Sequence, residues 1–332
     1  MQLSRFPRRR YTPHPTELVP LRRLSSHLGG PTIWLKRDDQ LGLAGGGNKA
    51  RKLEFLVADA LERGADTLVT TGAVQSNHCR MTLAAARQEG LACRLVIEER
   101  VPGSYDEGAS GNNLLFRLLD AERVAVVPAG ADLAAALQAE VDDLAASGRV
   151  GYVIPGGGSN PLGALGYVAA AKELMTQADA MGLVIDRVVV ASGSGGTHAG
   201  LVAGLTGLSS GVPVIGISTR ADEATQAAKI LDLARRTAAL AGSSVAVRPE
   251  DVIVRDGYVG PGYSLPTDGM VEAVRLFARL EGVLLDPVYS GKAAAGLIDL
   301  VRRGELGSGE DVVLVHTGGW PALFAYRDYF GV

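Results

Sequence analysis

Short runs of β-branched and other apolar residues alternate along the chain with longer stretches that are rich in Ala and Leu. This alternation is typical of a parallel α/β architecture, in which helices connect successive strands. The stretch 49–64 shows the helical pattern clearly, because its apolar residues recur at intervals of three and four and Gly64 is suited to end a helix. The runs that predict strands are 32–38, 66–72, 93–98, 123–129, 152–157, 187–193, 212–218 and 311–319.

Many of the predicted strands end in glycine-rich turns that lead into helices. Ligands bind at the carboxyl ends of the strands in open parallel sheets, so these turns are candidate binding segments. The polar segment 102–113 is expected to be a surface loop, and the stretch 156–163 is a candidate crossing between two lobes.

Composition narrows the function without identifying it. The chain has 332 residues, of which 47% are hydrophobic, and a formal net charge of −3. This length suits two domains, and the balanced charge gives no electrostatic footprint for nucleic acid or an anionic membrane. Two cysteines without metal-binding spacing predict neither a disulfide framework nor a metal site, and they favour a cytoplasmic location. Neither a secretory signal nor an apolar run of membrane-spanning length is found in the sequence.

The first stretch with candidate chemistry is GGGNK at 45–49, where a glycine turn runs into a predicted helix. Glycine lets the backbone approach a ligand closely, and Asn48 is suited to the helix start. Only six of the 33 basic residues are lysines, which makes each lysine a better candidate for amine chemistry. Lys49 is a candidate nucleophile, because a Lys amine forms Schiff bases with carbonyl groups once burial lowers its pKa. The alternative is a glycine turn beside a solvated lysine.

Two further stretches place small and polar residues between a strand and a helix. TTGAVQSNHCR at 70–80 would put Ser-Asn-His at a helix N-terminus, where free amides can hold a carboxylate; a simple capping pair is the alternative. VVVASGSGGTHAGLVAG at 188–204 offers loop amides and the hydroxyls of Ser194 and Thr197 as a phosphate cradle, with close helix packing as the alternative. The second stretch matches neither the P-loop nor the dinucleotide pattern, which disfavours an NAD-dependent dehydrogenase.

A fourth stretch, LLDPVYSGKAAAGL at 284–297, places Tyr289 and Ser290 between a strand-like run and a helix of small residues. Together the four stretches suggest one shared crevice. A phosphate cradle and a candidate Schiff-base lysine, with no metal motif, point to pyridoxal 5′-phosphate as the cofactor. A binding protein that kept the cradle without turnover is a hypothesis of another class, although the retained Lys49 counts against it.

Over essentially the whole chain, the sequence resembles the fold-type II pyridoxal-phosphate enzymes of the D-cysteine desulfhydrase and 1-aminocyclopropane-1-carboxylate deaminase group. The resemblance implies an α/β fold of two three-layer open parallel-sheet domains, like the tryptophan synthase β subunit, and a homodimer. The large cofactor-binding domain would comprise 1–45 and 160–332, and the small inserted domain 46–159. The matching motifs are RFPRR at 5–9, GGNKARKLEF at 46–55, QSNH at 75–78, SGSGGTHAG at 192–200, LLDPVYSGK at 284–292 and HTGG at 316–319.

The resemblance also implies roles for individual residues. Lys49 would form the Schiff base with the cofactor and move the substrate α-proton. Asn77 would hydrogen-bond the hydroxyl of the cofactor ring, and Ser76, Asn77 and His78 would hold the substrate carboxylate. Tyr289 would be a catalytic tyrosine. The remaining implied site residues are Lys52, Ser194, Gly195, Gly196 and Thr197 for the cofactor phosphate, and Tyr263 as the second catalytic tyrosine.

Two positions discriminate within the group. The deaminases have Glu after the DPVY tyrosine and Leu before the GG of the HxGG motif, whereas this chain has Ser290 and Thr317, as the desulfhydrases do. A neutral hydroxyl near the cofactor's pyridine nitrogen gives a milder electron sink, which is adequate for expelling a good β-leaving group. The resemblance therefore implies α,β-elimination from a small amino acid, with D-cysteine as the first candidate substrate.

Several alternatives stay open within this cofactor class. L-cysteate sulfo-lyase is the nearest, because GLAGGGNK and PGGGSNPLGALGYV also resemble those enzymes. A deaminase, an amino-acid racemase and a β-replacing synthase are further alternatives. Trp320, which follows HTGG, departs from the small residue that the family has there and is expected to shape the substrate pocket.

Overall fold

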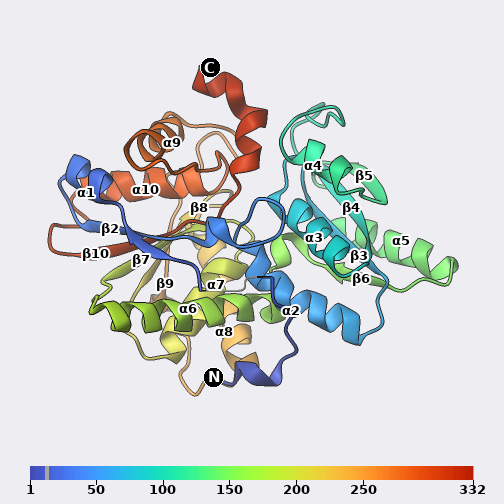
Figure 1. The fold of residues 1–332 in the computed structure, drawn as a ribbon, viewed down its shortest axis with the longest axis horizontal. Helices are drawn as coiled ribbons and strands as arrows, with labels where there is room; N and C mark the ends of the chain where they lie inside the picture. The colour runs from blue at the N-terminus through green and yellow to red at the C-terminus, as the bar shows by residue number, and fades with distance from the viewer. Residues whose placement is uncertain (12–14, 332) are drawn as a thin grey trace.

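Two β-sheets lie beside each other in the computed structural model, which describes residues 1–11 and 15–331 (Figure 1). Every strand pair in that part of the chain is parallel except the first two strands of the larger sheet. The larger sheet runs in the order β1 (Leu18–Pro20), β2 (Thr32–Lys36), β10 (Asp311–Val315), β7 (Arg187–Ser192), β8 (Val214–Ser218) and β9 (Val252–Arg255). The smaller runs in the order β5 (Arg123–Pro128), β4 (Ala92–Glu99), β3 (Thr67–Ala73) and β6 (Gly151–Ile154).

Helices cover both faces of the larger sheet, which gives three layers (Figure 1). Alternate residues of β7 point to opposite faces, because successive side chains of a strand do so. Val188 and Val190 therefore lie in one core, and Val189 and Ala191 lie in the other. The first core is closed by α6 (Pro161–Met181), α7 (Gly196–Gly207) and α8 (Glu223–Leu240). The second is closed by α1 (Arg22–Leu28), α9 (Asp268–Glu281) and α10 (Ser290–Arg302).

The smaller sheet is also covered on both faces. Leu68 of β3 and Leu95 of β4 pack under the helices of one face, whereas Val69 and Val96 pack under the helix of the other. The first face carries α2 (Lys49–Glu62) and α3 (Asn77–Gln88), with α4 (Asn112–Leu118) against α3; the second carries α5 (Leu133–Ala146). Short 3₁₀ turns are η1 (Leu3–Arg5), η2 (Asp38–Gln40), η3 (Gly156–Gly158), η4 (Pro249–Asp251) and η5 (Trp320–Phe330).

The expected α/β fold with two sheets is confirmed, although some local predictions were wrong. Strands β1 and β9 were missed because they are only three and four residues long. The apolar run before Tyr289 is not a strand. The segment 102–113 is not a surface loop throughout, because Asn112 and Asn113 begin α4 and are buried.

Helix α2 joins the two sheet units in space. It covers the smaller sheet and also packs closely against α6, which covers the larger one. Gly166 makes this approach possible, because a Cβ there would come within 2.2 Å of the Arg51 carbonyl oxygen. The domain boundaries at 45/46 and 159/160 remain a prediction.

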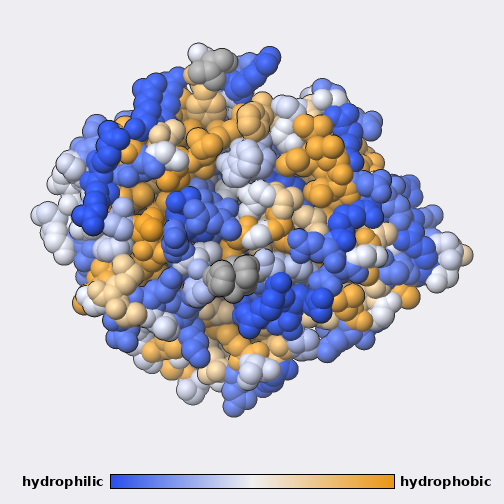
Figure 2. All heavy atoms as spheres, viewed as in Figure 1, coloured by the Kyte–Doolittle hydropathy of each residue, from blue (hydrophilic) through white to orange (hydrophobic). Residues whose placement is uncertain are grey.

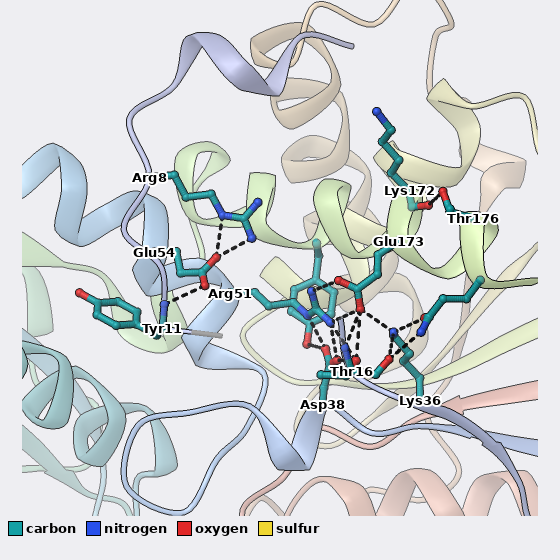
Figure 3. A network of polar contacts seen from close by, with 12 residues as sticks. Arg8, Tyr11, Thr16, Lys36, Asp38, Arg51, Glu54, Lys172, Glu173 and Thr176 are labelled. Carbon is teal, nitrogen blue, oxygen red and sulfur yellow. Dashed lines mark hydrogen bonds and ion pairs between the residues drawn. The ribbon is translucent and has the colours of Figure 1, made fainter. Parts of the chain in front are cut away.

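Buried charges fix the first turn of α2 against the larger sheet unit (Figure 3). The Arg51 guanidinium donates to both oxygens of Asp38, at 2.8 and 2.9 Å, and to both oxygens of Glu173, each at 2.9 Å. Lys36 Nζ donates to Glu173 Oε1 at 2.5 Å, and the Tyr167 hydroxyl donates to Asp38 Oδ2 at 2.6 Å. Each buried charge therefore has an opposite charge or a hydrogen bond, which keeps the beginning of α2 in one position.

The surface shows no single chemical character on the face drawn in Figure 2, where hydrophilic and hydrophobic residues are interspersed. Among residues 1–11 and 15–331, no helix is both long enough and apolar enough to cross a membrane.

Candidate active site

A cavity of about 620 Å³ opens where strands of both sheets end. Its walls include Thr71 at the end of β3, Pro155 after β6 and Ser194 after β7, so both units contribute. A smaller recess adjoins it, and Lys49 and Tyr289 line both. The predicted crevice at the carboxyl ends of the strands is thus present in the structure.

Lys49 is the first residue of α2 and reaches the wall between the cavity and the recess. Its Nζ donates to Asn48 Oδ1 at 2.8 Å and lies 5.5 Å from the centre of the Tyr289 ring. Burial lowers the pKa of the Lys49 amine to about 8; the Asp286 carboxylate opposes this shift and the Arg80 guanidinium adds to it. About one amine in eleven is therefore neutral at pH 7 and can attack a carbonyl group.

Asn48 occupies the N-cap position of α2, but it does not cap the helix with its side chain. Its Oδ1 accepts from Lys49 Nζ, and its Nδ2 donates to Thr197 Oγ1 at 2.8 Å. The helix starts at this residue as expected, but the Asn48 side chain joins the lysine to the glycine-rich loop of α7 and does not cap the helix.

The glycine turn before Lys49 is needed for backbone geometry. Gly46 has a φ of 76°, and a Cβ there would lie 1.9 Å from the Asp39 carbonyl oxygen. A side chain at this position would collide with the backbone that leads into the turn. The glycines therefore let the chain reverse tightly and bring Lys49 to the cavity.

The loop predicted to hold a phosphate lies at the N-terminus of α7. Gly195 is its N-cap residue with a φ of 101°, and the first N–H groups of a helix have no partner within the helix. The Ser159 hydroxyl donates to Ser194 Oγ at 2.7 Å and accepts from the Gly196 amide at 3.1 Å. Thr197 lines the adjoining recess. Free amides, hydroxyls and the positive end of the helix converge on one point, which suits a phosphate.

Lys52 lies behind this loop and lines neither the cavity nor the recess. Its Nζ donates to the Gly157 carbonyl at 3.0 Å and lies 3.0 Å from the place where a Cβ on Gly196 would stand. Burial lowers the pKa of Lys52 well below its ordinary value, and the charges of Lys49 and Lys229 lower it further. A buried cation beside free helix amides would be stabilised by an anion, so the residues present fit a bound phosphate.

Ser76, Asn77 and His78 lie at the start of α3 and line the cavity. Ser76 is the N-cap residue, and its hydroxyl accepts from the Cys79 amide at 3.1 Å. His78 Nε2 lies 2.8 Å from Thr70 Oγ1, whose single proton goes to the Ile154 carbonyl. His78 therefore donates through Nε2, and burial lowers its pKa well below the ordinary value, so the ring is neutral.

The neutral His78 ring has a consequence for carboxylate binding. Its Nδ1 is a buried acceptor with no hydrogen-bond partner in the described part of the chain, and an acceptor cannot hold a carboxylate. If His78 contacts a substrate carboxylate as predicted, it therefore does so through its backbone N–H at the helix start and not through its ring.

Asn77 has only one orientation that satisfies its neighbours. Its Oδ1 accepts from Arg80 Nη1 and from Asn112 Nδ2, both at 2.9 Å. Because arginine can only donate, the amide oxygen must face Arg80, and the Asn77 NH₂ group remains free for a ligand. The Nδ2 atom lies only 2.5 Å from where a Cβ on Gly319 would stand, so this glycine keeps the space beside the amide open.

Tyr289 and Tyr263 meet at the cavity wall. Their hydroxyl groups are hydrogen-bonded to each other, and their rings are 5.9 Å apart at an angle of 66°. Burial raises the pKa of Tyr289 well above its ordinary value, and contact with Tyr263 raises it further. The Tyr289 hydroxyl therefore stays protonated and can donate a proton.

Of three other predicted site residues, only one lines the cavity or the recess. Thr317 lines the recess, whereas Ser290 is buried below it and bonds to Asp286 Oδ1 at 2.7 Å. Trp320 lines neither the cavity nor the recess; it is 37% exposed, and its Nε1 donates to the Gly45 carbonyl at 3.0 Å. The ligand-binding roles of these three residues remain predictions.

Sequence reasoning missed several residues that contribute to the site. Arg80 lies three residues after Asn77 on the predicted helix, and residues three apart share a helix face. The sequence could therefore have indicated that Arg80 lies beside Asn77. Ser159 and Asn112 come from other elements and gave no local signal. Asp286 stood within a quoted motif but was not singled out. The remaining missed residues on the cavity wall are Arg100, Arg220 and Lys229.

Comparison with known proteins shows the family to which the chain belongs. A family model described as "Pyridoxal-phosphate dependent enzyme" matches residues 10–318. D-cysteine desulfhydrase of Salmonella typhimurium is 46% identical over 329 residues, which cover 98% of each chain. D-cysteine desulfhydrase of Salmonella paratyphi C is 47% identical over 330 residues, again with 98% coverage of each chain. A solved structure titled "Crystal Structure Analysis of the ACC deaminase homologue" shares 38% identity with a TM-score of 0.88, covering 99% of this chain and 96% of that one.

Proposed function

The chain belongs to the family of pyridoxal-phosphate dependent enzymes, and we propose that it converts D-cysteine to pyruvate, ammonia and sulfide. The observation that carries this proposal is a half-buried lysine with a lowered pKa, which lines a cavity beside the loop suited to a phosphate. The chain that holds it is 46% identical to a D-cysteine desulfhydrase over nearly its full length.

Pyridoxal 5′-phosphate is the cofactor. Its phosphate would be held by Ser194, Gly195, Gly196 and Thr197 at the start of α7, with Lys52 behind them. Asn77 would donate its NH₂ group to the hydroxyl of the ring, and Ser290 would contact the pyridine nitrogen. When bound, the cofactor supplies an electron sink for the carbanion that forms at the substrate Cα.

The chain's own residues bind the substrate and move its protons. The free amides at the start of α3, together with Ser76 and Asn77, hold the substrate carboxylate. Neutral Lys49 Nζ takes the α-proton, since its lowered pKa makes it a base near neutral pH. The Cβ–S bond then breaks and its electrons leave with sulfur. We expect Tyr289, which is hydrogen-bonded to Tyr263, to protonate the departing sulfur. The aminoacrylate that is released is hydrolysed by water to pyruvate and ammonia.

Two other reactions are tested against this proposal. The solved neighbour's title supports a deaminase acting on 1-aminocyclopropane-1-carboxylate, but Ser290 presents a hydroxyl where the deaminases have Glu. L-cysteate sulfo-lyase would use the same residues and release sulfite.

A substrate panel distinguishes these reactions. Purified protein is incubated with D-cysteine, L-cysteine, L-cysteate, 3-chloro-D-alanine and 1-aminocyclopropane-1-carboxylate, and sulfide, sulfite and 2-oxo acids are measured. We expect sulfide and pyruvate from D-cysteine, and loss of both in Lys49→Ala together with the cofactor's Schiff-base absorbance. The matched control Lys172→Ala removes an exposed lysine of α6 and should behave as wild type. Turnover of the cyclopropane substrate alone, or of L-cysteate alone, would overturn the proposal.

We also propose that the enzyme is a cytoplasmic homodimer. Cys79 and Cys93 are both buried free thiols, as expected of a protein in a reducing compartment. The dimer follows from the family resemblance, and light scattering of the purified protein tests it; a mass of 34.5 kDa would indicate a monomer instead.

A further inference from the structure

The rim of the cavity carries three cationic side chains that come from both sheet units. Arg100 follows β4 of the smaller sheet, Arg220 follows β8 of the larger sheet, and Lys229 lies on α8. Arg220 and Lys229 are exposed to solvent. Among the described residues that line this cavity, none is Asp or Glu. Positive charge therefore converges on one opening from segments that are distant in sequence.

Among the described residues, only one of these three cations is paired with a carboxylate. Arg100 has one carboxylate partner, Glu98, at 2.5 Å, and its guanidinium lies 4.2 Å above the Tyr263 ring. Within residues 1–11 and 15–331, Arg220 and Lys229 have no hydrogen-bond or ion-pair partner. Partial burial lowers the pKa of the Lys229 amine, and the positive charges of Arg220 and Arg100 lower it further, so both arginines repel protonated Lys229. Such repulsion is relieved when an anion binds between them.

The site already provides for two anionic groups. The phosphate of the cofactor is assigned to the loop at α7, and the substrate carboxylate is assigned to the start of α3. The proposed elimination brings a third anion into the cavity, because a thiolate β-substituent leaves with the electron pair of the Cβ–S bond and is still the anion HS⁻ after it takes a proton from Tyr289. Arg100 is suited to this third group, since it lies over Tyr263, whose hydroxyl contacts Tyr289 beside Lys49.

We propose that Arg100, Arg220 and Lys229 form an anion subsite that binds the β-substituent of the substrate. This subsite selects small amino acids whose β-substituent carries a negative charge, such as a thiolate, a sulfonate or a carboxylate. The proposal rests on the elimination proposed above, because that reaction places the β-substituent in this cavity. It also gives the departing anion a positively charged path to solvent.

Aspartate and asparagine provide a matched pair of probes. They differ in the charge of the β-substituent and have no good leaving group, so binding can be measured without turnover. Each enantiomer is titrated into the cofactor-loaded protein, and the absorbance of the bound cofactor reports occupancy. We expect aspartate to bind more tightly than asparagine, with a preference that falls as salt is raised.

Variants that lack one positive charge test which side chains cause the preference for aspartate over asparagine. Arg220→Gln and Lys229→Gln should each reduce the aspartate-to-asparagine affinity ratio roughly two- to fivefold, which is the range for a solvent-screened ion pair. Lys172→Gln, which removes an exposed charge of α6 that does not line the cavity, should leave the ratio as in wild type. The two glutamine variants should also raise KM for L-cysteate or D-cysteine more than KM for 3-chloro-D-alanine.

Each outcome decides between distinct explanations. An unchanged affinity ratio in both variants would overturn the subsite. Weaker retention of pyridoxal phosphate with an unchanged ratio would assign the cations to the cofactor phosphate and overturn it as well. If wild-type protein prefers aspartate but eliminates from none of the amino acids, the proposed function fails while the anion subsite stands.

Discussion

Replacing Arg80 with Met would separate the electrostatic role of this residue from its structural role. Arg80 is completely buried, and it donates to Asn77 Oδ1 at 2.9 Å, to Asn112 Oδ1 at 2.7 Å and to the Gly46 carbonyl at 2.9 Å. It therefore orients the Asn77 amide, which lines the cavity, and ties α3 to the glycine turn before Lys49. Met keeps much of the volume but removes the charge and all the donors.

The structure gives the expected magnitudes. Two buried acceptors, Asn112 Oδ1 and the Gly46 carbonyl, would lose the donor that they have in the described chain. Each unsatisfied acceptor costs about 1–3 kcal/mol, partly offset because a buried guanidinium is no longer desolvated. We expect the free energy of unfolding to fall by about 2–4 kcal/mol, measured by urea denaturation.

The charge effect has a separate magnitude. Arg80 is a positive neighbour that disfavours protonated Lys49, so its removal raises the lysine pKa from about 8 toward the ordinary 10.5. Burial, the main cause of the lowered pKa, remains in the variant, so only part of the shift is lost. At pH 7 about one amine in eleven is neutral with a pKa of about 8, and each unit by which the pKa rises lowers that fraction about tenfold. The rate of cofactor capture by the apoprotein, followed by absorbance, should therefore fall at pH 7 and recover at higher pH.

The pH midpoint of cofactor capture is the informative measurement, because a purely structural defect would slow capture at every pH. Arg80→Lys keeps the charge and should retain a midpoint closer to that of wild type. Arg87→Met serves as the control, since Arg87 lies on the same helix but bonds at the protein surface. A midpoint in Arg80→Met that equals the wild-type value would refute the electrostatic reasoning.

Three further substitutions test the supports of the site. Arg51→Met leaves two carboxylates buried without their main cation and should cost about 3–5 kcal/mol of unfolding free energy in urea; a loss below 1 kcal/mol would contradict the anchoring role. Gly46→Ala places a Cβ 1.9 Å from the Asp39 carbonyl oxygen at positive φ, so cofactor binding measured by absorbance should be lost; normal binding would show that the turn can rearrange. Ser290→Ala removes the hydroxyl that contacts Asp286. The free energy of unfolding should fall by about 1–3 kcal/mol, which is measured as a lower thermal midpoint. An unchanged midpoint would mean that another group satisfies the carboxylate.

The sequence alone was sufficient for the fold class and for the main chemical groups. The alternation of apolar runs with helical stretches reports local periodicity, which strands and helices of this length enforce. The segments around Lys49, Asn77 and Ser194 also gave local signals, because a glycine turn or small polar residues before a helix have few structural uses. Strands β1 and β9 were missed because three or four residues are too few to show a period.

Only the tertiary structure decided how these groups act together. The lowered pKa of Lys49 depends on burial and on Arg80, and the orientation of Asn77 depends on Asn112, which lies 35 residues away. Arg100 follows a strand of the smaller sheet and Arg220 a strand of the larger one, so only the packing of the two sheet units brings both to one opening. Periodicity and short motifs can be read from a sequence because they are local. The burial of the Lys49 amine, the orientation of the Asn77 amide and the gathering of positive side chains at the cavity arise from packing between segments that are distant in sequence. The candidate lysine was therefore readable from the sequence, but its environment was not.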